Sequence, residues 1–342
     1  MPVTVSTPAA QDAAVFPPRQ RPALRLVSTK GMPRETWLDV RRQGIGSSDA
    51  AAAVGLNPYQ SQLELWMHKT GKGALLPATD PNDETSPMYW GTLLEPIVAA
   101  HYTKRTGNRV RRVNAVLGHP QIPWMLANID REVVGASDVQ ILECKTAGIN
   151  GAKLWKEGVP EYIQLQVMHQ LAVTGKQAAD VAVLICGQEL QIHRIERDET
   201  MITQLIALEA QFWEWVKTEL EPPADASESA ATALRCLYAQ DTGEEIDLSE
   251  DEAASSAFTQ LQQIRCHLQD CETKEALFKH QIQQRMGNAS FARFAGGAVS
   301  WKRSKDSQVF HAALLQKEHP EIAQAYLGTK PGSRRFLLHA EH

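Results

Sequence analysis

The sequence predicts a mixed α/β fold followed by a long helical extension. Between Val110 and Thr146, short runs rich in Val and Ile are separated by Gly, His-Pro or Ala-Ser, which is typical of strands. Amphipathic stretches on both sides of these runs favour a central sheet flanked by helices. Beyond residue 223, apolar residues recur at alternating spacings of three and four, which predicts one long helix.

The composition is that of an ordinary globular protein. The chain has 342 residues, 35 Lys and Arg against 40 Asp and Glu, and 43% hydrophobic residues, enough for one large or two smaller domains. No apolar run approaches the roughly 18 residues of a membrane span, and the start of the chain lacks a signal core, so we expect a cytoplasmic protein without a membrane segment. Five cysteines without a CxxC pair indicate reduced thiols rather than a zinc or iron-sulfur site.

The first elements are helical. Residues 1–30 are rich in Ala, Pro, Ser and Thr without periodicity and predict a flexible arm. From Glu35 to Gly71 we expect a helix, a glycine turn, an Ala-rich helix, a Gly-Leu-Asn-Pro-Tyr turn and a further helix. The stretch 79–88 reads as a loop, and the helix after it is expected to stop at Gly107.

The strand-like region continues into a helix at 162–175, another strand over 180–198 and a long amphipathic helix ending before Pro222. The predicted core domain therefore spans residues 31–222. The region 223–342 is predicted to contain a long helix and short strands.

The long helix is expected to begin with Ser249 and Glu252 as a capping box and to end at Gly287. Its apolar stripe favours packing on its own domain, and a coiled coil with a partner is the alternative. Two basic pieces, 296–307 and 332–339, look strand-like; they indicate solvated charge or contact with nucleic acid. The stripe consists of Phe258, Leu261, Ile264, Leu268, Cys271, Phe278 and Ile282.

One charged constellation interrupts the apolar strands. Glu143 and Lys145 are two residues apart in ILECKTA and so project from one face of a strand. Asp130 lies thirteen residues upstream, a spacing that lets two adjacent strands bring it beside Glu143. Two carboxylates suit a hard divalent cation, and the lysine can position or deprotonate a water, which points to phosphodiester hydrolysis. The alternative is a surface ion pair.

Four blocks of the sequence resemble the YqaJ-type viral recombinases, phage exonucleases related to lambda exonuclease within the PD-(D/E)xK superfamily. The blocks are residues 37–71, WGTLLEP, NID followed by ILECKTA, and YIQLQVMHQL, in that order. The resemblance implies a restriction-endonuclease-like core with a central mixed sheet flanked by helices. It also implies Mg²⁺ as the cofactor, with Mn²⁺ as the alternative.

The resemblance also implies roles for individual residues. Glu95, Asp130 and Glu143 would bind metal together with the backbone carbonyl of Cys144, and Lys145 would be the catalytic lysine. Gln164 would hold the scissile phosphate or its water, in preference to Gln166.

The resemblance further implies that Arg41 and Ser48 grip a terminal 5′ phosphate. On local grounds a turn leading into a helix can also gather an anion. A helix cap formed by Ser48 and Asp49 explains the same residues equally well.

The activity implied is 5′-to-3′ degradation of one strand of double-stranded DNA from its end, leaving a 3′ single strand for homologous recombination. Expected partners are DNA ends, a RecT/Beta-like single-strand annealing protein and further copies of the chain in a trimeric ring. The ring would need basic residues in its channel, and the densest candidates are Lys104, Arg105, Arg109, Arg111 and Arg112. An endonuclease on the same core, or a non-catalytic DNA-binding scaffold, remains the alternative.

Overall fold

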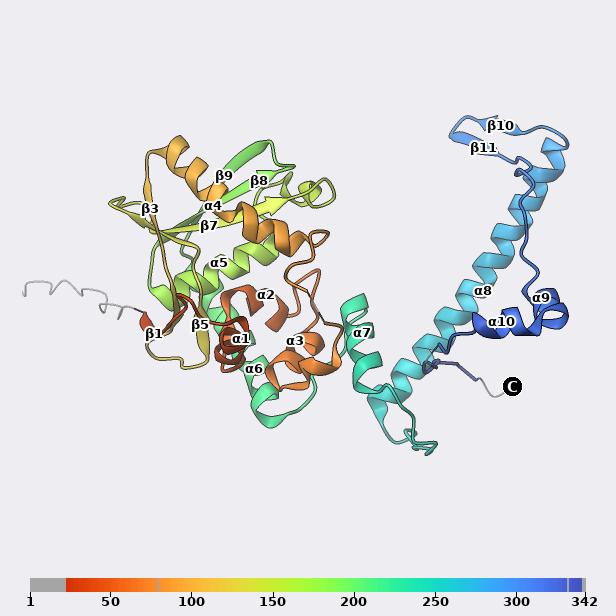
Figure 1. Cartoon of the computed structure of the whole chain (residues 1–342), viewed down its shortest axis with the longest axis horizontal. Coiled ribbons are helices and arrows are strands. Elements are labelled where there is room, and N and C mark those ends of the chain that lie inside the picture. Colours follow the sequence, from red (N-terminus) through yellow and green to blue (C-terminus); the bar gives the residue numbers. More distant parts are fainter. Residues whose placement is uncertain (1–22, 79, 331, 340–342) are drawn as a thin grey trace, which may run out of the picture. The chain divides into compact units, whose positions relative to one another are not determined.

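The computed structural model describes residues 23–78, 80–330 and 332–339. The chain divides between Leu237 and Tyr238 into two compact units (Figure 1). The division predicted at residue 222 is too early, because helix α7 (Glu228–Leu237) packs against helix α3 (Gln62–Lys69) of the first unit. Ser229 of α7 donates its hydroxyl to Glu64 Oε2 at 2.6 Å, which fixes that contact.

The first unit contains a five-stranded mixed sheet with the order β3-β6-β7-β8-β9. Strands β7 and β8 are parallel and the other neighbours are antiparallel, so the predicted mixed sheet flanked by helices is confirmed. Its strands are β3 (Arg109–Arg112), β6 (Arg131–Val134), β7 (Ile141–Ala147), β8 (Ala178–Ile185) and β9 (Glu189–Glu196).

The two faces of this sheet are covered by different helices. Leu142 and Cys144 of β7 pack with helix α4 (Pro87–Thr106), whereas Ile141 and Ala147 belong to the core formed with helix α5 (Glu161–Thr174). This alternation follows from the two-residue period of a strand. Glu143 and Lys145 therefore project toward the α5 side.

A second, four-stranded sheet has the order β1-β4-β5-β2. The flexible arm predicted over residues 1–30 is wrong for its last part, because Leu24–Ser28 forms strand β1, paired with β4. Residues 1–22 lie outside the described part of the chain. The other strands are β2 (Ile45–Gly46), β4 (Ala115–Gly118) and β5 (Met125–Ala127).

The helices predicted for the first unit are confirmed. Gly107 ends α4 in the left-handed conformation, with φ of 77°, as expected from the sequence. The remaining helices are α1 (Arg34–Arg42), α2 (Ala50–Ala53) and α6 (Glu199–Thr218), with 3₁₀ turns at Ser47–Asp49, Lys72–Leu75 and Gly151–Trp155. Among the described residues, no helix is both long and apolar enough to cross a membrane.

The segment 180–198 is a hairpin rather than one strand. Strands β8 and β9 pair from Ala178 with Glu196 to Ile185 with Glu189. Cys186 and Gly187 between them both have positive φ values, 50° and 72°, which is the geometry of a tight hairpin turn. Cysteine is not a usual residue at such a turn, so the sequence carried little signal for it.

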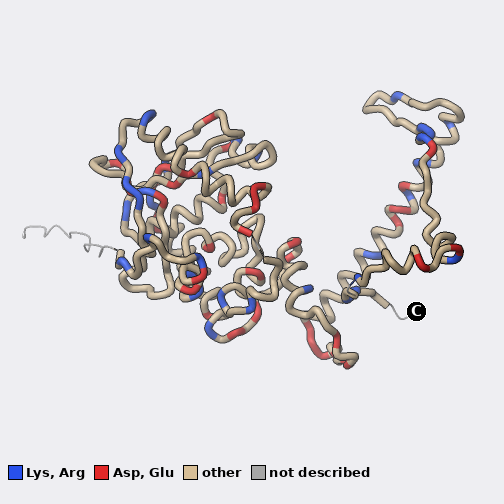
Figure 2. Tube along the Cα trace, in the orientation of Figure 1, with Lys and Arg blue, Asp and Glu red and all other residues tan. Residues whose placement is uncertain are grey.

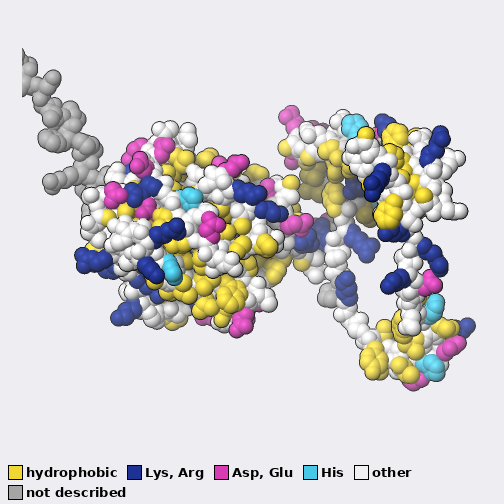
Figure 3. All heavy atoms as spheres, turned by 90° about the horizontal axis from the view of Figure 1, so that it is seen from above, with side chains coloured by type: hydrophobic (Ala, Val, Ile, Leu, Met, Phe, Trp, Pro, Cys, Tyr) yellow, Lys and Arg dark blue, Asp and Glu magenta, His cyan; other side chains and the backbone are white. Residues whose placement is uncertain are grey.

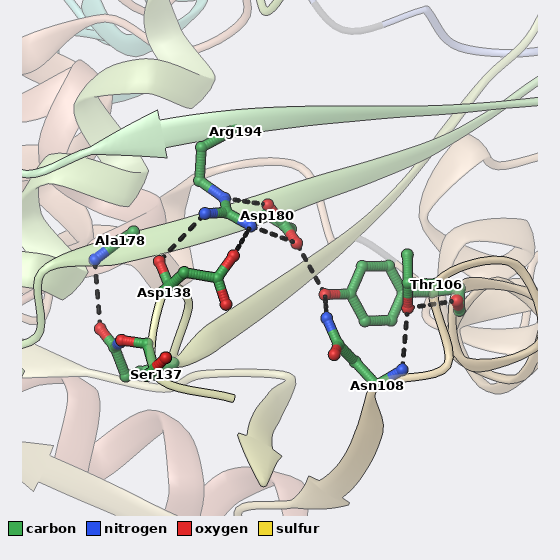
Figure 4. A network of polar contacts seen from close by, with 9 residues as sticks. Thr106, Asn108, Ser137, Asp138, Ala178, Asp180 and Arg194 are labelled. Atoms are coloured by element: carbon green, nitrogen blue, oxygen red, sulfur yellow. Dashed lines mark hydrogen bonds and ion pairs between the residues drawn. The ribbon is translucent and has the colours of Figure 1, made fainter. Parts of the chain in front are cut away.

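A buried polar network fastens α4 to the sheet (Figure 4). The Tyr102 hydroxyl of α4 donates to Asp180 of β8 at 2.6 Å, and Arg194 of β9 forms an ion pair with the same carboxylate. Burial, together with the hydrogen bond to Asp180, raises the pKa of Tyr102 to about 12, so its hydroxyl keeps the proton it donates. The network fixes the position of the helix that carries Glu95.

The second unit is built on the long helix α8 (Glu252–Met286), and Gly287 ends it as predicted. Its cap differs from the prediction: Asp251, not Ser249, accepts a hydrogen bond from Ala254 N at 2.9 Å. The described residues do not bury the apolar stripe, since Ile264 and Phe278 remain 54% and 59% exposed. Exposed apolar side chains of this unit are visible in Figure 3.

Short elements complete the second unit. The predicted strand at 296–307 is confirmed only over β11, and the basic piece 332–339 has neither helix nor strand. These elements are β10 (Phe291–Phe294), β11 (Gly297–Ser300), α9 (Ala312–Glu318) and α10 (Pro320–Ala325).

Candidate active site

Glu143 and Lys145 lie side by side on β7, as the strand period predicts. Lys145 Nζ is 2.7 Å from Glu143 Oε1, and the Glu143 side chain is only 3% exposed. Burial alone would lower the pKa of Lys145, but the negative charges of Glu143 and Asp130 outweigh it and raise that pKa. Lys145 is therefore an ammonium group at neutral pH, held on a buried carboxylate.

Helix α5 supplies two amides to this pair. Gln166 Nε2 donates to Glu143 Oε1 at 2.6 Å, while its Oε1 accepts from Lys145 Nζ at 3.0 Å. Gln170 Nε2 donates to Glu143 Oε2 at 2.8 Å. Both oxygens of Glu143 are thus oriented by glutamines one helical turn apart.

Gln164, the glutamine expected to hold the scissile phosphate or its water, contacts neither Glu143 nor Lys145 in this structure. Its amide points elsewhere and donates to the Val159 carbonyl at 2.6 Å. Gln164 and Gln166 are two residues apart on a helix, so they face in nearly opposite directions. Gln166 is the residue that contacts both Glu143 and Lys145.

Asp130 lies at the place where β6 and β7 separate. The two strands pair at only two positions, and Asp130 Oδ2 then accepts a hydrogen bond from Cys144 N at 2.9 Å. Burial, followed by the charge of Glu143, raises the pKa of Asp130 to about 8. Burial likewise raises the pKa of the Cys144 thiol, which makes that side chain a neutral, packed group.

Glu95 of α4 is held by an arginine that the sequence analysis did not single out. Arg131 forms an ion pair with Glu95 and also donates to the Asp130 carbonyl at 2.8 Å. Within the described residues, no three His, Cys, Asp or Glu side chains converge closely enough to hold a metal. The ligands expected from the sequence, three carboxylates and a backbone carbonyl, are of the oxygen type that Mg²⁺ prefers.

The structure brings Arg41 and Ser48 together in a second cluster. Arg41 Nη2 donates to Ser48 Oγ at 2.7 Å, and Arg41 also forms an ion pair with Asp49. Lys69 Nζ of α3 lies 2.6 Å from Asp49 Oδ2. Although burial opposes it, the charges of Arg41 and Lys69 hold the pKa of Asp49 well below its usual range.

Within this cluster, Asp49 is buried and Ser48 is exposed to solvent. Asp49 Oδ2 accepts from Gly46 N at 3.0 Å, which places this buried carboxylate at the base of the cluster. Ser48 is exposed, and Arg41 is partly exposed. An anion approaching Ser48 would meet a guanidinium already held in place.

The two clusters are joined through one carbonyl. Ser47 Oγ donates to the Asn128 carbonyl at 3.3 Å, and Gln170 Nε2 donates to the same oxygen at 3.2 Å. Because Gln170 also binds Glu143, a continuous set of hydrogen bonds runs from the serine turn to β7. The predicted carboxylates and the predicted phosphate-binding residues therefore belong to one region of the fold.

Comparison with known proteins shows what this chain is similar to. The model of the YqaJ-like viral recombinase domain matches residues 36–177, which include every residue placed in the two clusters. The chain is also 35% identical over 302 residues to YqaJ of Bacillus subtilis (strain 168), covering 87% of this chain and 92% of that protein. The chain belongs to the YqaJ-like viral recombinase family. The family resemblance stated from the four blocks is thus confirmed.

Two solved structures are among those similar to this chain. An alkaline exonuclease, LHK-Exo, from Laribacter hongkongensis is 24% identical, with a TM-score of 0.44 over 55% of this chain and 94% of that one. A phage-related exonuclease from Haemophilus somnus 129PT is 10% identical, with a TM-score of 0.36 over 54% of this chain and 99% of that one.

Proposed function

We propose that this protein is a divalent-metal-dependent deoxyribonuclease that degrades one strand of duplex DNA from a 5′ end. The observation that carries the proposal is the group formed by Asp130, Glu143 and Lys145, in which two largely buried carboxylates lie beside an ammonium. Buried charges of one sign are unfavourable unless a cation compensates them. This group therefore suits a bound divalent cation and an anionic substrate.

The metal-binding residues in this proposal are Glu95, Asp130 and Glu143, together with the Cys144 carbonyl. A bound Mg²⁺ would supply a Lewis acid for the phosphoryl oxygens and a water of lowered pKa. Mn²⁺ is the alternative ion. The raised pKa of Asp130 supports this assignment, since the environment disfavours its anion when no cation is present.

The chain's own residues would do the remaining work. Lys145 would donate hydrogen bonds to the water or to the phosphate, because its raised pKa keeps it charged. Gln166 and Gln170 would hold the Glu143 carboxylate in one orientation through their amide groups. Such prior orientation lowers the barrier because no reorganisation is needed during the reaction.

The preference for a 5′ end rests on Arg41 and Ser48. A guanidinium and a hydroxyl 2.7 Å apart form a small anion site, and Asp49 with Lys69 holds the guanidinium in place. A terminal phosphate monoester carries more charge than an internal phosphodiester. Binding at this site would therefore favour ends over internal positions.

Assembly into a trimeric ring and cooperation with a RecT/Beta-like annealing protein remain predictions from the resemblance. Sedimentation of the purified protein would report the first directly. Retention of a purified annealing protein on the immobilised chain would report the second.

The test is digestion of linear duplexes labelled separately at the 5′ and 3′ ends, with magnesium or with EDTA, beside a closed circular duplex. Loss of strands from phosphorylated 5′ ends alone, abolished by EDTA and with circles intact, is the expected result. Cutting of circles would indicate the endonuclease instead. Folded protein that binds DNA but cuts no substrate would indicate the non-catalytic scaffold.

A further inference from the structure

A basic cavity of ≈770 Å³ lies outside the two clusters described above. Five cations line it: Arg25, Lys30, Arg111, Arg112 and Lys176. Glu132 is the one acidic side chain among the described residues that line it. Figure 2 shows Lys and Arg gathered along the edge of the first unit that carries β1 and β3.

The topology explains why these cations converge. Strand β3 belongs to the five-stranded sheet and β4 to the four-stranded sheet, and only Val113 and Asn114 separate them. Thr29 N donates to the Asn114 carbonyl at 3.2 Å, which ties the end of β1 to this crossover. Arg25 and Lys30 are therefore brought beside Arg112, although about 80 residues of sequence lie between them.

Glu132 compensates only part of this charge. It forms an ion pair with Arg111, its register partner on β3, and lies 3.8 Å from Lys176 Nζ. Within the described part of the chain, no ion pair reaches Arg25, Lys30 or Arg112. All three are exposed, so a net positive charge faces solvent from a concave surface.

The cavity adjoins the candidate active site along two elements. Ile129 lines the cavity, and the next residue is Asp130. Lys176 follows Gly175, which ends α5 with φ of 67°, and the same helix carries Gln166 and Gln170. The cavity is thus linked to the carboxylates through Ile129, which directly precedes Asp130, and through helix α5.

The chemistry of the lining favours phosphates over bases. No aromatic side chain is found among the described residues of the lining, so a base would have no ring on which to stack. Long, exposed Arg and Lys side chains suit phosphate oxygens and do not read sequence.

We propose that this cavity binds the phosphodiester backbone of the DNA substrate, next to the site of hydrolysis. The inference rests on the proposed function, since it assigns a second anchoring point to the same substrate. Contacts in this cavity would hold the duplex while its 5′ end is bound at Arg41 and Ser48.

The test measures binding of a 5′-phosphorylated duplex in EDTA, where no hydrolysis is needed, as a function of salt. The double variant Arg25→Ala, Arg112→Ala is expected to bind about tenfold more weakly at about 0.1 M salt. The slope of log affinity against log salt should fall by about two, one for each lost phosphate contact. The variant Arg25→Lys, Arg112→Lys should keep most of the slope.

A matched control removes two cations elsewhere on the first unit. Lys217 and Arg235 are not part of the cavity lining, and Lys217→Ala, Arg235→Ala should bind like the wild type. Thermal unfolding of each variant checks that the fold is retained. If the cavity variant loses affinity only for single-stranded DNA, the cavity binds the strand that remains after digestion, through the same phosphodiester groups.

Several outcomes overturn the proposal. These are unchanged affinity and slope in the cavity variant, an equal loss in the control, reduced binding of a 5′ mononucleotide only, or no DNA binding by the wild type. Wild-type protein that binds DNA in EDTA but hydrolyses none with magnesium would contradict the proposed nuclease while leaving the cavity test intact.

Discussion

Gln170 donates its side-chain amide to Oε2 of Glu143 at 2.8 Å, across the contact between α5 and β7. The same nitrogen reaches the Asn128 carbonyl at 3.2 Å, which also receives the Ser47 hydroxyl. Gln170 is fully buried. A small shift of α5 would therefore move the Glu143 carboxylate and the serine turn together.

Gln166 and Gln164 form a matched pair for testing the geometry. Gln166→Ala should lower kcat about 10- to 100-fold, because it removes the amide that contacts both Glu143 and Lys145. Gln164→Ala should change kcat by less than about threefold, because that side chain contacts the Val159 carbonyl. Rates on a 5′-labelled duplex at saturating DNA give the comparison. The reverse order of effects would return the role to Gln164.

The phosphate-binding role of Arg41 and Ser48 predicts a change in end preference. Ser48→Ala removes the hydroxyl 2.7 Å from Arg41 without disturbing the ion pair with Asp49. The ratio of rates on 5′-phosphate and 5′-hydroxyl ends should fall about tenfold, as expected for one lost charged hydrogen bond. Equal losses on both kinds of end would favour a purely structural role as a helix cap.

A buried ion pair fixes α5 from its other side. His169 Nδ1 lies 2.7 Å from Glu209 Oε1 of α6, and both side chains are 0% exposed. His169 Nε2 lies 2.9 Å from the Leu126 carbonyl, which can only accept a hydrogen bond. Burial alone would lower the pKa of His169, but the Glu209 charge outweighs it and raises that pKa.

Glu209→Ala should destabilise the protein by about 3–5 kcal/mol, because it leaves an unpaired buried imidazolium. Glu214→Ala on the same helix removes an exposed partner of Lys217. It should change the free energy of unfolding by less than about 0.5 kcal/mol. Urea unfolding of both variants measures the difference. Similar values for the two would contradict the assigned ion pair.

The same pair predicts how stability depends on pH. Because the pKa of His169 is raised on folding, its contribution is fully present below the unfolded pKa near 6.5 and is lost as pH rises through the folded pKa. The Glu209→Gln protein should lose less stability than the wild type as pH rises over that interval. Parallel curves for wild type and variant would argue that His169 is neutral throughout.

Asp130 predicts the pH dependence of metal binding. Its pKa rises from 3.8 to about 8 on folding, so the cation-free protein should lose stability as pH rises through that range. A bound cation replaces the proton, and saturating magnesium should therefore raise Tm more at about pH 8.5 than at about pH 5.5. Asp130→Asn should abolish the difference. An equal gain at both pH values would exclude Asp130 as the ligand.

Local periodicity accounts for what the sequence predicted correctly. Glu143 and Lys145 share a face because a strand repeats every two residues, and the structure places their charged atoms 2.7 Å apart. Gln166 and Gln170 are four residues apart on a helix and so face the same way, a spacing that favours Gln166 over Gln164 as the contact to Glu143.

Contacts between distant segments account for what was missed. Strand β1 is short and depends on β4, about 90 residues later, so its own residues read as part of a flexible arm. In the sequence, Arg131 resembles any solvent-exposed arginine next to an aspartate. Its partner Glu95 lies 36 residues earlier and reaches it only when α4 packs on the sheet. Lys69 likewise acquires its partner Asp49 only when α3 packs against the serine turn.

The most direct test of the proposed nuclease compares wild type with Glu143→Gln in single-turnover hydrolysis of a 5′-phosphorylated duplex. The substitution keeps the shape of the side chain and removes its charge, so the fold and DNA binding in EDTA should be retained. Glu196→Gln, on the exposed part of β9, is the control. We predict a loss of at least about 100-fold for Glu143→Gln alone, as for other groups that bind a catalytic metal. A folded Glu143→Gln protein with wild-type rate would contradict the assignment of this site.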